Sequence, residues 1–198
     1  MGRVNTEQSE PDQPDPDTGE PAGAVRVPHP RRLLGLLFGV AAALLAVDVL
    51  TKVVAVANLE DQPPVELFGG AVYLVLVRNP GAAFSLATGM TWLLAVLAIV
   101  VVGVIVWLAP KLRSRGWAVG LGLVLGGACG NLVDRLFREP GVLRGHVVDF
   151  VSLFAPDGSV WPVFNVADSA IVCGGALVVL LSLLGRDYDG TVHRKERE

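Results

Sequence analysis

Four stretches of the chain are almost wholly apolar and carry very few charges. They cover about residues 33–56, 91–109, 116–136 and 166–184. A helix needs about 20 apolar residues to cross the hydrocarbon core of a bilayer. The pattern therefore predicts four membrane-spanning helices.

The segment between the first two spans, residues 58–90, has a different pattern. Two short β-prone runs, 65–68 and 71–77, are separated by Gly69-Gly70, which is typical of a hairpin or a small sheet. Such a sheet could offer a strand edge to an extended peptide. The expected fold class is an all-α integral membrane protein with four transmembrane helices and a small extracytoplasmic β-rich segment.

Composition supports a membrane protein. Of the 198 residues, 52% are hydrophobic and only 18% are charged, and the mean hydropathy is +0.55, which is too apolar for an ordinary soluble domain of this length. Residues 1–30 are instead rich in Pro, Gly and acids, so we expect a disordered tail there. The four-span domain is expected to cover residues 31–186, and a second tail residues 187–198.

Basic residues predict the orientation. Arg31-Arg32, the loop 111–115 and the tail 186–195 all fall on one side of a four-span arrangement. The positive-inside rule makes that side cytoplasmic. Both termini are then cytoplasmic, and the segments 58–90 and 137–165 lie outside.

Several polar side chains stand at or near the outer ends of these apolar segments: Asn131, Asp134, Asp149, Asn165 and Asp168. Ionisable groups in such places are expensive and usually functional. Two nearby carboxylates cannot both ionise readily, so one could hold a proton while the other activates water. The alternative is that these acids only cap helices and pair with arginines, and spacing alone leaves both interpretations open. Asn165 could cap the last helix.

Two further pairs of charges need an interpretation. Asp48 and Lys52 are four residues apart, hence on one helical face. They could be an interfacial ion pair with Lys52 reaching the headgroups, or a strut that holds a nearby site. Arg135 follows Asp134 directly, which suggests local charge compensation.

Other classes of protein remain to be weighed. A transporter could bind cations with the outer acids, although its charges would more often lie near the bilayer midplane. A scaffold could use the same polar residues only to join helices. No His-Glu-x-x-His sequence or Gly-x-Ser-x-Gly elbow is present, which argues against a zinc or serine hydrolase.

Five ordered blocks resemble the lipoprotein signal peptidase (signal peptidase II) family, over about residues 33–185. The blocks are Asp48–Lys52, Asn79–Phe84, Gly130–Arg135, Val147–Phe150 and Phe164–Asp168. Each block is short, but five in order at predicted outer membrane edges are specific.

The resemblance implies a membrane aspartic endopeptidase with Asp149 and Asp168 as its catalytic pair. It would use water to cleave the signal peptide from diacylglyceryl-modified prolipoproteins, just before the lipidated cysteine, at the outer face of the bacterial cell (inner) membrane. The implied partners are these prolipoproteins and membrane lipids, with no nucleic acid, no metal and no organic cofactor. The positions implied to support the site or bind substrate are Asp48, Lys52, Asn79, Gly81, Asn131, Asp134, Arg135 and Asn165.

Overall fold

The computed structural model describes residues 30–81 and 91–192. The expected disordered tail therefore lies outside the described residues, apart from Pro30. Residues 82–90 of the outer segment and the last residues of the C-terminal tail, 193–198, also lie outside.

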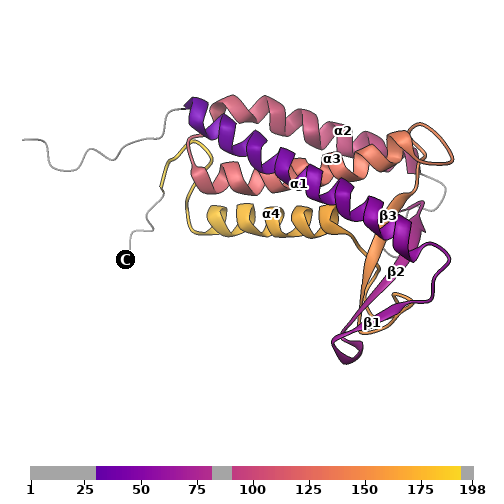
Figure 1. The fold of residues 1–198 in the computed structure, drawn as a ribbon. Helices are drawn as coiled ribbons and strands as arrows, with labels where there is room; N and C mark the ends of the chain where they lie inside the picture. Colours follow the sequence, from indigo (N-terminus) through magenta and orange to yellow (C-terminus); the bar gives the residue numbers. More distant parts are fainter. Residues whose placement is uncertain (1–29, 82–90, 193–198) are drawn as a thin grey trace, which may run out of the picture.

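Four helices lie side by side and form the body of the protein (Figure 1). They are α1 (Pro30–Leu59), α2 (Thr91–Leu108), α3 (Arg115–Phe137) and α4 (Val166–Leu183). Each is long and apolar enough to cross a membrane. Together with a small sheet at one end, they confirm the predicted fold class.

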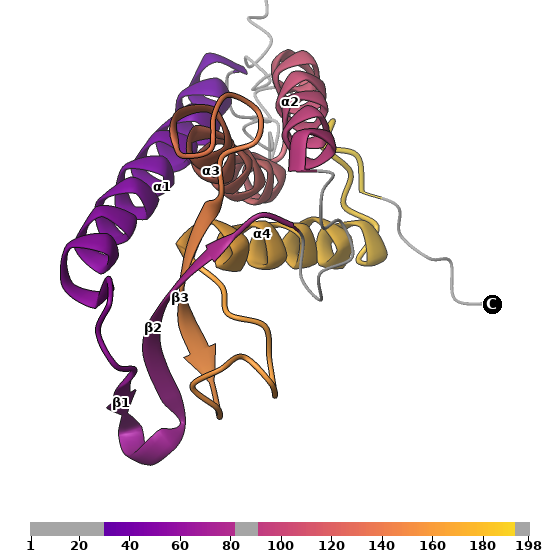
Figure 2. The same cartoon turned by 90° about the vertical axis from the view of Figure 1, so that its right-hand side faces the viewer.

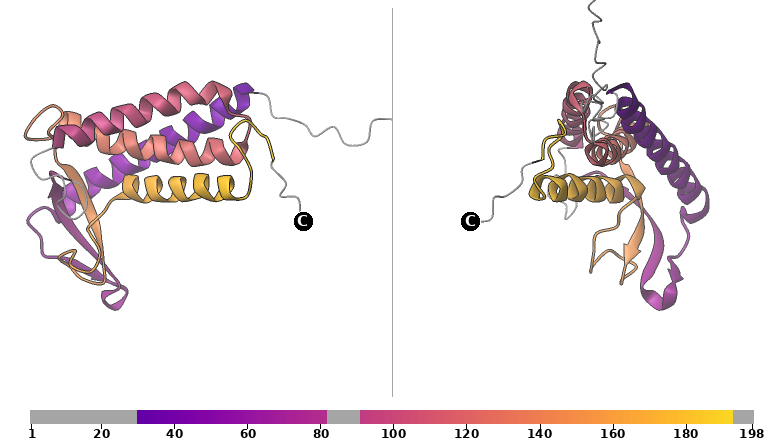
Figure 3. Two further views of the ribbon diagram at one scale, coloured as in Figure 1. Left: turned by 180° about the vertical axis from the view of Figure 1, so that it is seen from behind. Right: turned by 90° about the vertical axis from the view of Figure 1, so that its left-hand side faces the viewer.

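Helix α3 is the centre of this bundle. It contacts the other three helices, and in the views from the front and from behind it lies between α2 and α4 (Figures 1 and 3). Its glycines permit this packing. A Cβ on Gly122 would lie 2.8 Å from the carbonyl oxygen of Leu37, and one on Gly126 would lie 2.8 Å from that of Ala41. The glycine row of α3 thus lets the backbone of α1 approach closely.

The sheet has three antiparallel strands in the order β1-β2-β3. Strands β1 (Val65–Leu67) and β2 (Val72–Asn79) form the predicted hairpin. Strand β3 (Val147–Leu153) comes from the segment between α3 and α4 and pairs with β2. Figure 2 shows the sheet extending away from one end of the bundle, on the side of α4. We call this end of the bundle the sheet end.

An apolar cluster fixes the sheet to the bundle. Val148 and Phe150 of β3 pack with Ala55 and Leu59 at the end of α1. Successive side chains of a strand point to opposite faces, so Asp149 points away from this cluster. The burial of its two neighbours thus sets the direction of the Asp149 carboxyl group.

The opposite end of the bundle holds both described termini (Figure 1). After α4 the chain turns back, and the carbonyl oxygen of Tyr188 accepts hydrogen bonds from the backbone N–H groups of Arg113 (2.7 Å) and Ser114 (3.3 Å). The indole of Trp117 donates to the carbonyl oxygen of Arg186 at 2.7 Å. These contacts satisfy backbone donors at the start of α3 and connect the chain after α4 to that helix.

Candidate active site

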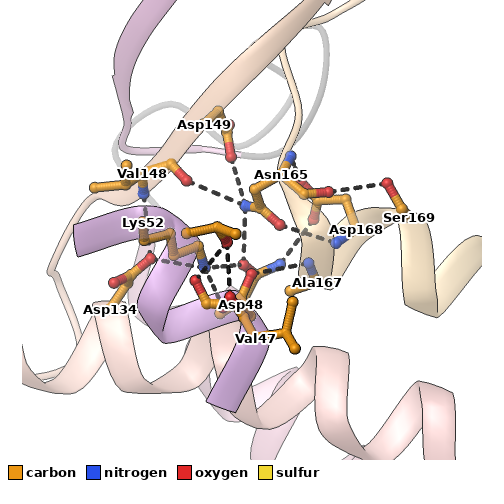
Figure 4. A network of polar contacts seen from close by, with 12 residues as sticks. Val47, Asp48, Lys52, Asp134, Val148, Asp149, Asn165, Ala167, Asp168 and Ser169 are labelled. Atoms are coloured by element: carbon orange, nitrogen blue, oxygen red, sulfur yellow. Dashed lines mark hydrogen bonds and ion pairs between the residues drawn. The ribbon is translucent and has the colours of Figure 1, made fainter. Parts of the chain in front are cut away.

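Three elements bring acids together at the sheet end of the bundle (Figure 4). Asp134 lies in the last turns of α3, Asp149 in the middle of β3 and Asp168 in the first turn of α4. Two of them, Asp149 and Asp168, line the same pocket.

The carboxyl group of Asp149 is buried and bonded by two side-chain amides. Its exposed fraction is 2%. Asn79 donates to Oδ2 at 2.8 Å, and Asn165 donates to Oδ1 at 2.7 Å. The Asn79 amide is itself oriented, because its Oδ1 accepts the backbone N–H of Gly81 at 2.9 Å. The turn after β2 therefore directs an N–H donor at Asp149.

The carboxyl group of Asp168 is held at the beginning of α4. Asn165 is the N-cap: its side chain accepts the Asp168 backbone N–H at 2.9 Å, and its own backbone N–H donates to Asp168 Oδ2 at 3.2 Å. This reciprocal capping box confirms the capping role expected for Asn165. The other oxygen, Oδ1, accepts the side-chain amide of Asn131 at 2.7 Å.

Asn165 therefore bonds both acids. Its Nδ2 donates to Asp149, while its backbone N–H donates to Asp168 (Figure 4). The same Nδ2 lies 3.2 Å from Asn131 Oδ1 and 3.3 Å from the carbonyl oxygen of Val148. The side chain of Asn165 thus connects the start of α4 to β3 and to the end of α3 through hydrogen bonds.

The environment of Asp149 raises its pKa to about 7. Burial is the main cause, since it penalises the charged form, and the negative charge of Asp168 adds to it. The amides of Asn79 and Asn165 and the charge of Lys52 act in the opposite direction. Near neutral pH, Asp149 can thus hold or release a proton.

Lys52 is the centre of a buried polar cluster beside this pair. Its ammonium group lies 2.8 Å from Asp48 Oδ2, 2.9 Å from Asp134 Oδ2 and 3.0 Å from Asn131 Oδ1. Lys52 is 1% exposed and Asp48 is fully buried, so the interfacial alternative, with Lys52 reaching the headgroups, is wrong. Asp48 also accepts the backbone N–H of Ala167 at 2.9 Å, which makes the pair a strut between α1 and α4.

The expected compensation of Asp134 by Arg135 is a charge interaction without a direct ion pair. Asp134 pairs with Lys52 and Arg138, and it accepts the backbone N–H of Val148 at 3.2 Å. Adjacent residues on a helix point in different directions, whereas residues four apart share a face. Arg135 is 7% exposed and lines the pocket. Within the described part of the chain, its Nη1 has no hydrogen-bond partner.

The pocket has a volume of about 550 Å³ and two kinds of wall. Its polar side consists of the two acids with Asn79 and Arg135. Its apolar side comes from α2, from the start of β3, from α4 and from the segment before α4. It consists of Leu94, Val147, Trp161, Pro162, Val163, Phe164, Ile171, Val172 and Cys173, with Gly81 and Ser169 completing the lining.

The pocket borders the surface that would face lipid. Val172 lines it while being 69% exposed on α4, and Cys173 beside it is also exposed. Leu94 of α2 also lines the pocket. A ligand could therefore reach the acids from the bilayer, between α2 and α4.

All ten site positions expected from the sequence lie in described parts of the chain, at or beside this pocket. Asn79, Gly81, Arg135, Asp149 and Asp168 line it, and the other five are joined to these through the bonds given above. The apolar wall was missed, because apolar residues in a membrane span give no signal of their own. In the described residues, no group of three His, Cys, Asp or Glu side chains could hold a metal ion.

Comparisons with known proteins agree with one another. The family model described as signal peptidase (SPase) II matches residues 40–184. A lipoprotein signal peptidase of Rhodococcus jostii is 57% identical over 94% of this chain and 92% of its own length. One of Mycobacterium avium is 52% identical over 93% and 97%, and one of Mycobacterium tuberculosis is 52% identical over 89% and 85%.

Solved structures show the same fold. A bacterial membrane enzyme matches with a TM-score of 0.65 at 24% identity, over 83% of this chain and 94% of its own. A second bacterial membrane enzyme matches with a TM-score of 0.63 at 25% identity, over 77% and 95%.

Proposed function

The chain belongs to the signal peptidase II family, and from this premise we propose that it is an aspartic endopeptidase in which Asp149 and Asp168 activate water. Membership makes it a multi-pass bacterial membrane peptidase of the lipoprotein signal peptidase type. The catalytic pair, the substrate lipid and the orientation are proposals.

The observation that carries the proposal is the bridging of both acids by Asn165, at 2.7 Å to Asp149 and 3.2 Å to Asp168. The two carboxyl groups share one pocket and one hydrogen-bond partner. Such proximity makes it unfavourable for both to be ionised. One proton shared between two acids is what general acid and base catalysis on a peptide bond needs.

The two environments support different roles. Asp168 lies at the N-terminus of α4, where the helix dipole favours a negative charge. Burial and the Asp168 charge raise the pKa of Asp149 to about 7. We therefore assign Asp168 as the ionised base and Asp149 as the protonated acid.

The reaction then needs no further group. Asp168 takes a proton from water while the water oxygen attacks the scissile carbonyl carbon, and Asp149 gives its proton to the carbonyl oxygen. In the tetrahedral intermediate, Asp168 passes its proton to the amide nitrogen. The C–N bond breaks, the carbonyl re-forms, and the hydroxyl proton returns to Asp149. The guanidinium of Arg135 is buried at the pocket, and its Nη1 has no hydrogen-bond partner among the described residues, so it can hold a backbone carbonyl of the substrate.

A lipid-modified substrate fits the walls of the pocket. The apolar side, between Leu94 of α2 and Val172 of α4, borders the bilayer surface. Acyl chains attached to a cysteine could remain in the membrane while the adjacent peptide bond reaches the acids. This supports a diacylglyceryl-modified prolipoprotein as the substrate.

We also propose that the sheet end faces the outside and that both termini are cytoplasmic. A Ser159→Cys variant without Cys129 and Cys173 should react with an impermeant thiol reagent added to intact cells. The matched Thr191→Cys variant, at the opposite end, should react only after lysis. The reverse result would invert the orientation.

Cleavage of a defined substrate tests the proposed function. The purified protein, in detergent, is given one prolipoprotein with and without the diacylglyceryl group, and the cleavage site is read by mass spectrometry. Cleavage of the lipidated form just before the modified cysteine is expected. Equal cleavage of both forms would refute the lipid requirement, and no cleavage by folded protein would refute the activity.

A further inference from the structure

The largest side chain in the pocket wall, Trp161, is not used by the mechanism above. It lines the same pocket as both acids. Its exposed fraction is 56%, and its indole N–H donates no hydrogen bond to any described residue. Trp117, at the other end of the bundle, instead donates its indole N–H to the carbonyl oxygen of Arg186. Trp161 thus has both an apolar ring and a hydrogen-bond donor available to a ligand.

The backbone holds Trp161 in place. Phe164 forms two hydrogen bonds with Val151 of β3, both at 2.9 Å. On the other side, Asp157 accepts the backbone N–H of Ser159 at 3.0 Å and closes a turn. Pro162 follows Trp161 directly and restricts it to extended backbone. Trp161 therefore lies on a short segment that is anchored on both sides.

Trp161 lies close to the sheet end of the membrane-spanning helix α4. It precedes Val166, the first residue of α4, by a few residues. Trp is favoured at this depth because its ring is apolar while its N–H seeks a polar partner. A lipid bound in the pocket would place its acyl chains along Val172 and its ester groups at the level of Trp161.

We propose that Trp161 is the specificity-determining residue that recognises the diacylglyceryl group of the substrate. The ring packs against the glyceryl carbons, and the indole N–H donates to an ester carbonyl oxygen. This rests on the proposed function, since it assumes that the lipidated cysteine binds beside the Asp149–Asp168 pair. The contact acts in binding, so Trp161 changes substrate affinity more than the rate of the chemical step.

Trp92 provides the matched control. It lies in the first turn of α2 at the same end of the bundle and is 47% exposed, but it does not line the pocket. If Trp161 only anchored the protein at the membrane interface, replacing Trp161 or Trp92 by Ala should have the same effect on substrate affinity.

The test compares Trp161→Ala, Trp161→Phe and Trp92→Ala with the wild type in nanodiscs. KM and kcat are measured on the lipidated prolipoprotein, and inhibition constants are measured for two product-like probes. One probe is a short peptide starting with diacylglyceryl-cysteine, and the other is the released signal peptide without lipid.

For Trp161→Ala we expect KM and the inhibition constant of the lipidated probe to rise about tenfold, as for a lost specific contact in a binding pocket. The kcat value and the inhibition constant of the signal peptide should stay close to wild type. Trp161→Phe keeps an aromatic ring but loses the N–H donor, so its KM and its inhibition constant for the lipidated probe should lie between those of the wild type and Trp161→Ala. For Trp92→Ala, all of these constants should match the wild type.

Three results would overturn the inference: an equal loss of affinity for both probes, the same effect from Trp92→Ala, or no inhibition of the wild type by the lipidated probe. Each of these leaves cleavage by the wild type intact. The proposed function would fail separately, by absence of cleavage before any Trp161 variant is compared.

Discussion

The side-chain amide of Asn131 donates a hydrogen bond to Oδ1 of Asp168 at 2.7 Å. Two other hydrogen bonds orient this amide: its Oδ1 accepts one from the ammonium group of Lys52 at 3.0 Å and one from the side-chain amide of Asn165 at 3.2 Å. With two donors on the oxygen, only the nitrogen can face Asp168. Lys52, the buried lysine of α1, thereby orients the Asn131 amide so that its N–H group donates to Asp168, the proposed catalytic base.

This arrangement predicts the effect of Asn131→Asp, which keeps the shape but replaces the donor with an acceptor. A carboxylate there would repel Asp168, and we expect kcat to fall by about 100-fold or more, as when an oriented donor is removed from a catalytic site. Asn58→Asp, at an exposed residue in the last turn of α1, is the control and should retain wild-type kcat. An unchanged kcat for Asn131→Asp would show that this bond does not support catalysis.

Lys52→Met should destabilise the protein. It leaves the carboxyl group of Asp48 buried without a cation and removes one of the two cations of Asp134. Breaking a buried pair from one side costs about 3–5 kcal/mol, so the thermal unfolding temperature in detergent should drop clearly. Lys111→Met, on an exposed lysine whose ammonium group lies 3.5 Å from the centre of the Trp107 ring, should lower the unfolding temperature far less.

The double variant Asp48→Asn/Lys52→Met refines that test, because it removes the orphaned charge as well. It should be more stable than Lys52→Met alone. If Lys52→Met unfolded at the wild-type temperature, Lys52 would not be the strut described here.

The packing of α1 on α3 predicts a strong effect of Gly126→Val. The new side chain would lie against the backbone of α1, since even a Cβ would be 2.8 Å from the Ala41 carbonyl oxygen. Overpacking of this kind costs about 1–3 kcal/mol. The same substitution at Gly103, where nothing lies within 4 Å, is the control for helix propensity. Equal unfolding temperatures for the two variants would contradict the close packing.

Activity should fall on the alkaline side as Asp149 loses its proton. The pKa of Asp149 is raised to about 7, so the acid is protonated below this pH and ionised above it. A mechanism that needs the protonated form therefore loses kcat/KM as pH rises through 7. The amide of Asn79 lowers this pKa, so Asn79→Leu should move the alkaline limb to higher pH.

The control for the pH profile is Gln62→Leu, which removes an exposed amide on the same side of the molecule. This variant should leave the alkaline limb of the kcat/KM profile at its wild-type pH. An alkaline limb that moved to lower pH in Asn79→Leu would contradict the role of the amide.

The fold class was predictable because membrane spans have a strong local signal: long apolar runs with few charges. The hairpin of β1 and β2 was equally visible from its two β-prone runs. Strand β3 was not predicted. It pairs with β2, which lies about 70 residues away in the sequence, and no short turn connects the two strands as it connects the strands of a hairpin.

The site was predictable in its residues but only partly in its contacts. The capping by Asn165 follows from its place just before an apolar run. The pairing of Asp134 with Lys52 does not, because it depends on how closely the glycines of α3 let α1 approach. Trp161 was missed for a similar reason: its place in the pocket wall depends on the anchoring of Phe164 to β3.

The most direct test of the central claim is single-turnover cleavage of the lipidated prolipoprotein by Asp149→Asn, Asp168→Asn and Asp157→Asn. Asp157 is exposed in the segment between β3 and α4, so its variant controls for loss of an outer carboxylate. If Asp149 and Asp168 act as a pair, each of the first two variants should fold and bind substrate but show no measurable cleavage, while Asp157→Asn cleaves at the wild-type rate. Cleavage at the wild-type rate by either Asp149→Asn or Asp168→Asn would contradict the account.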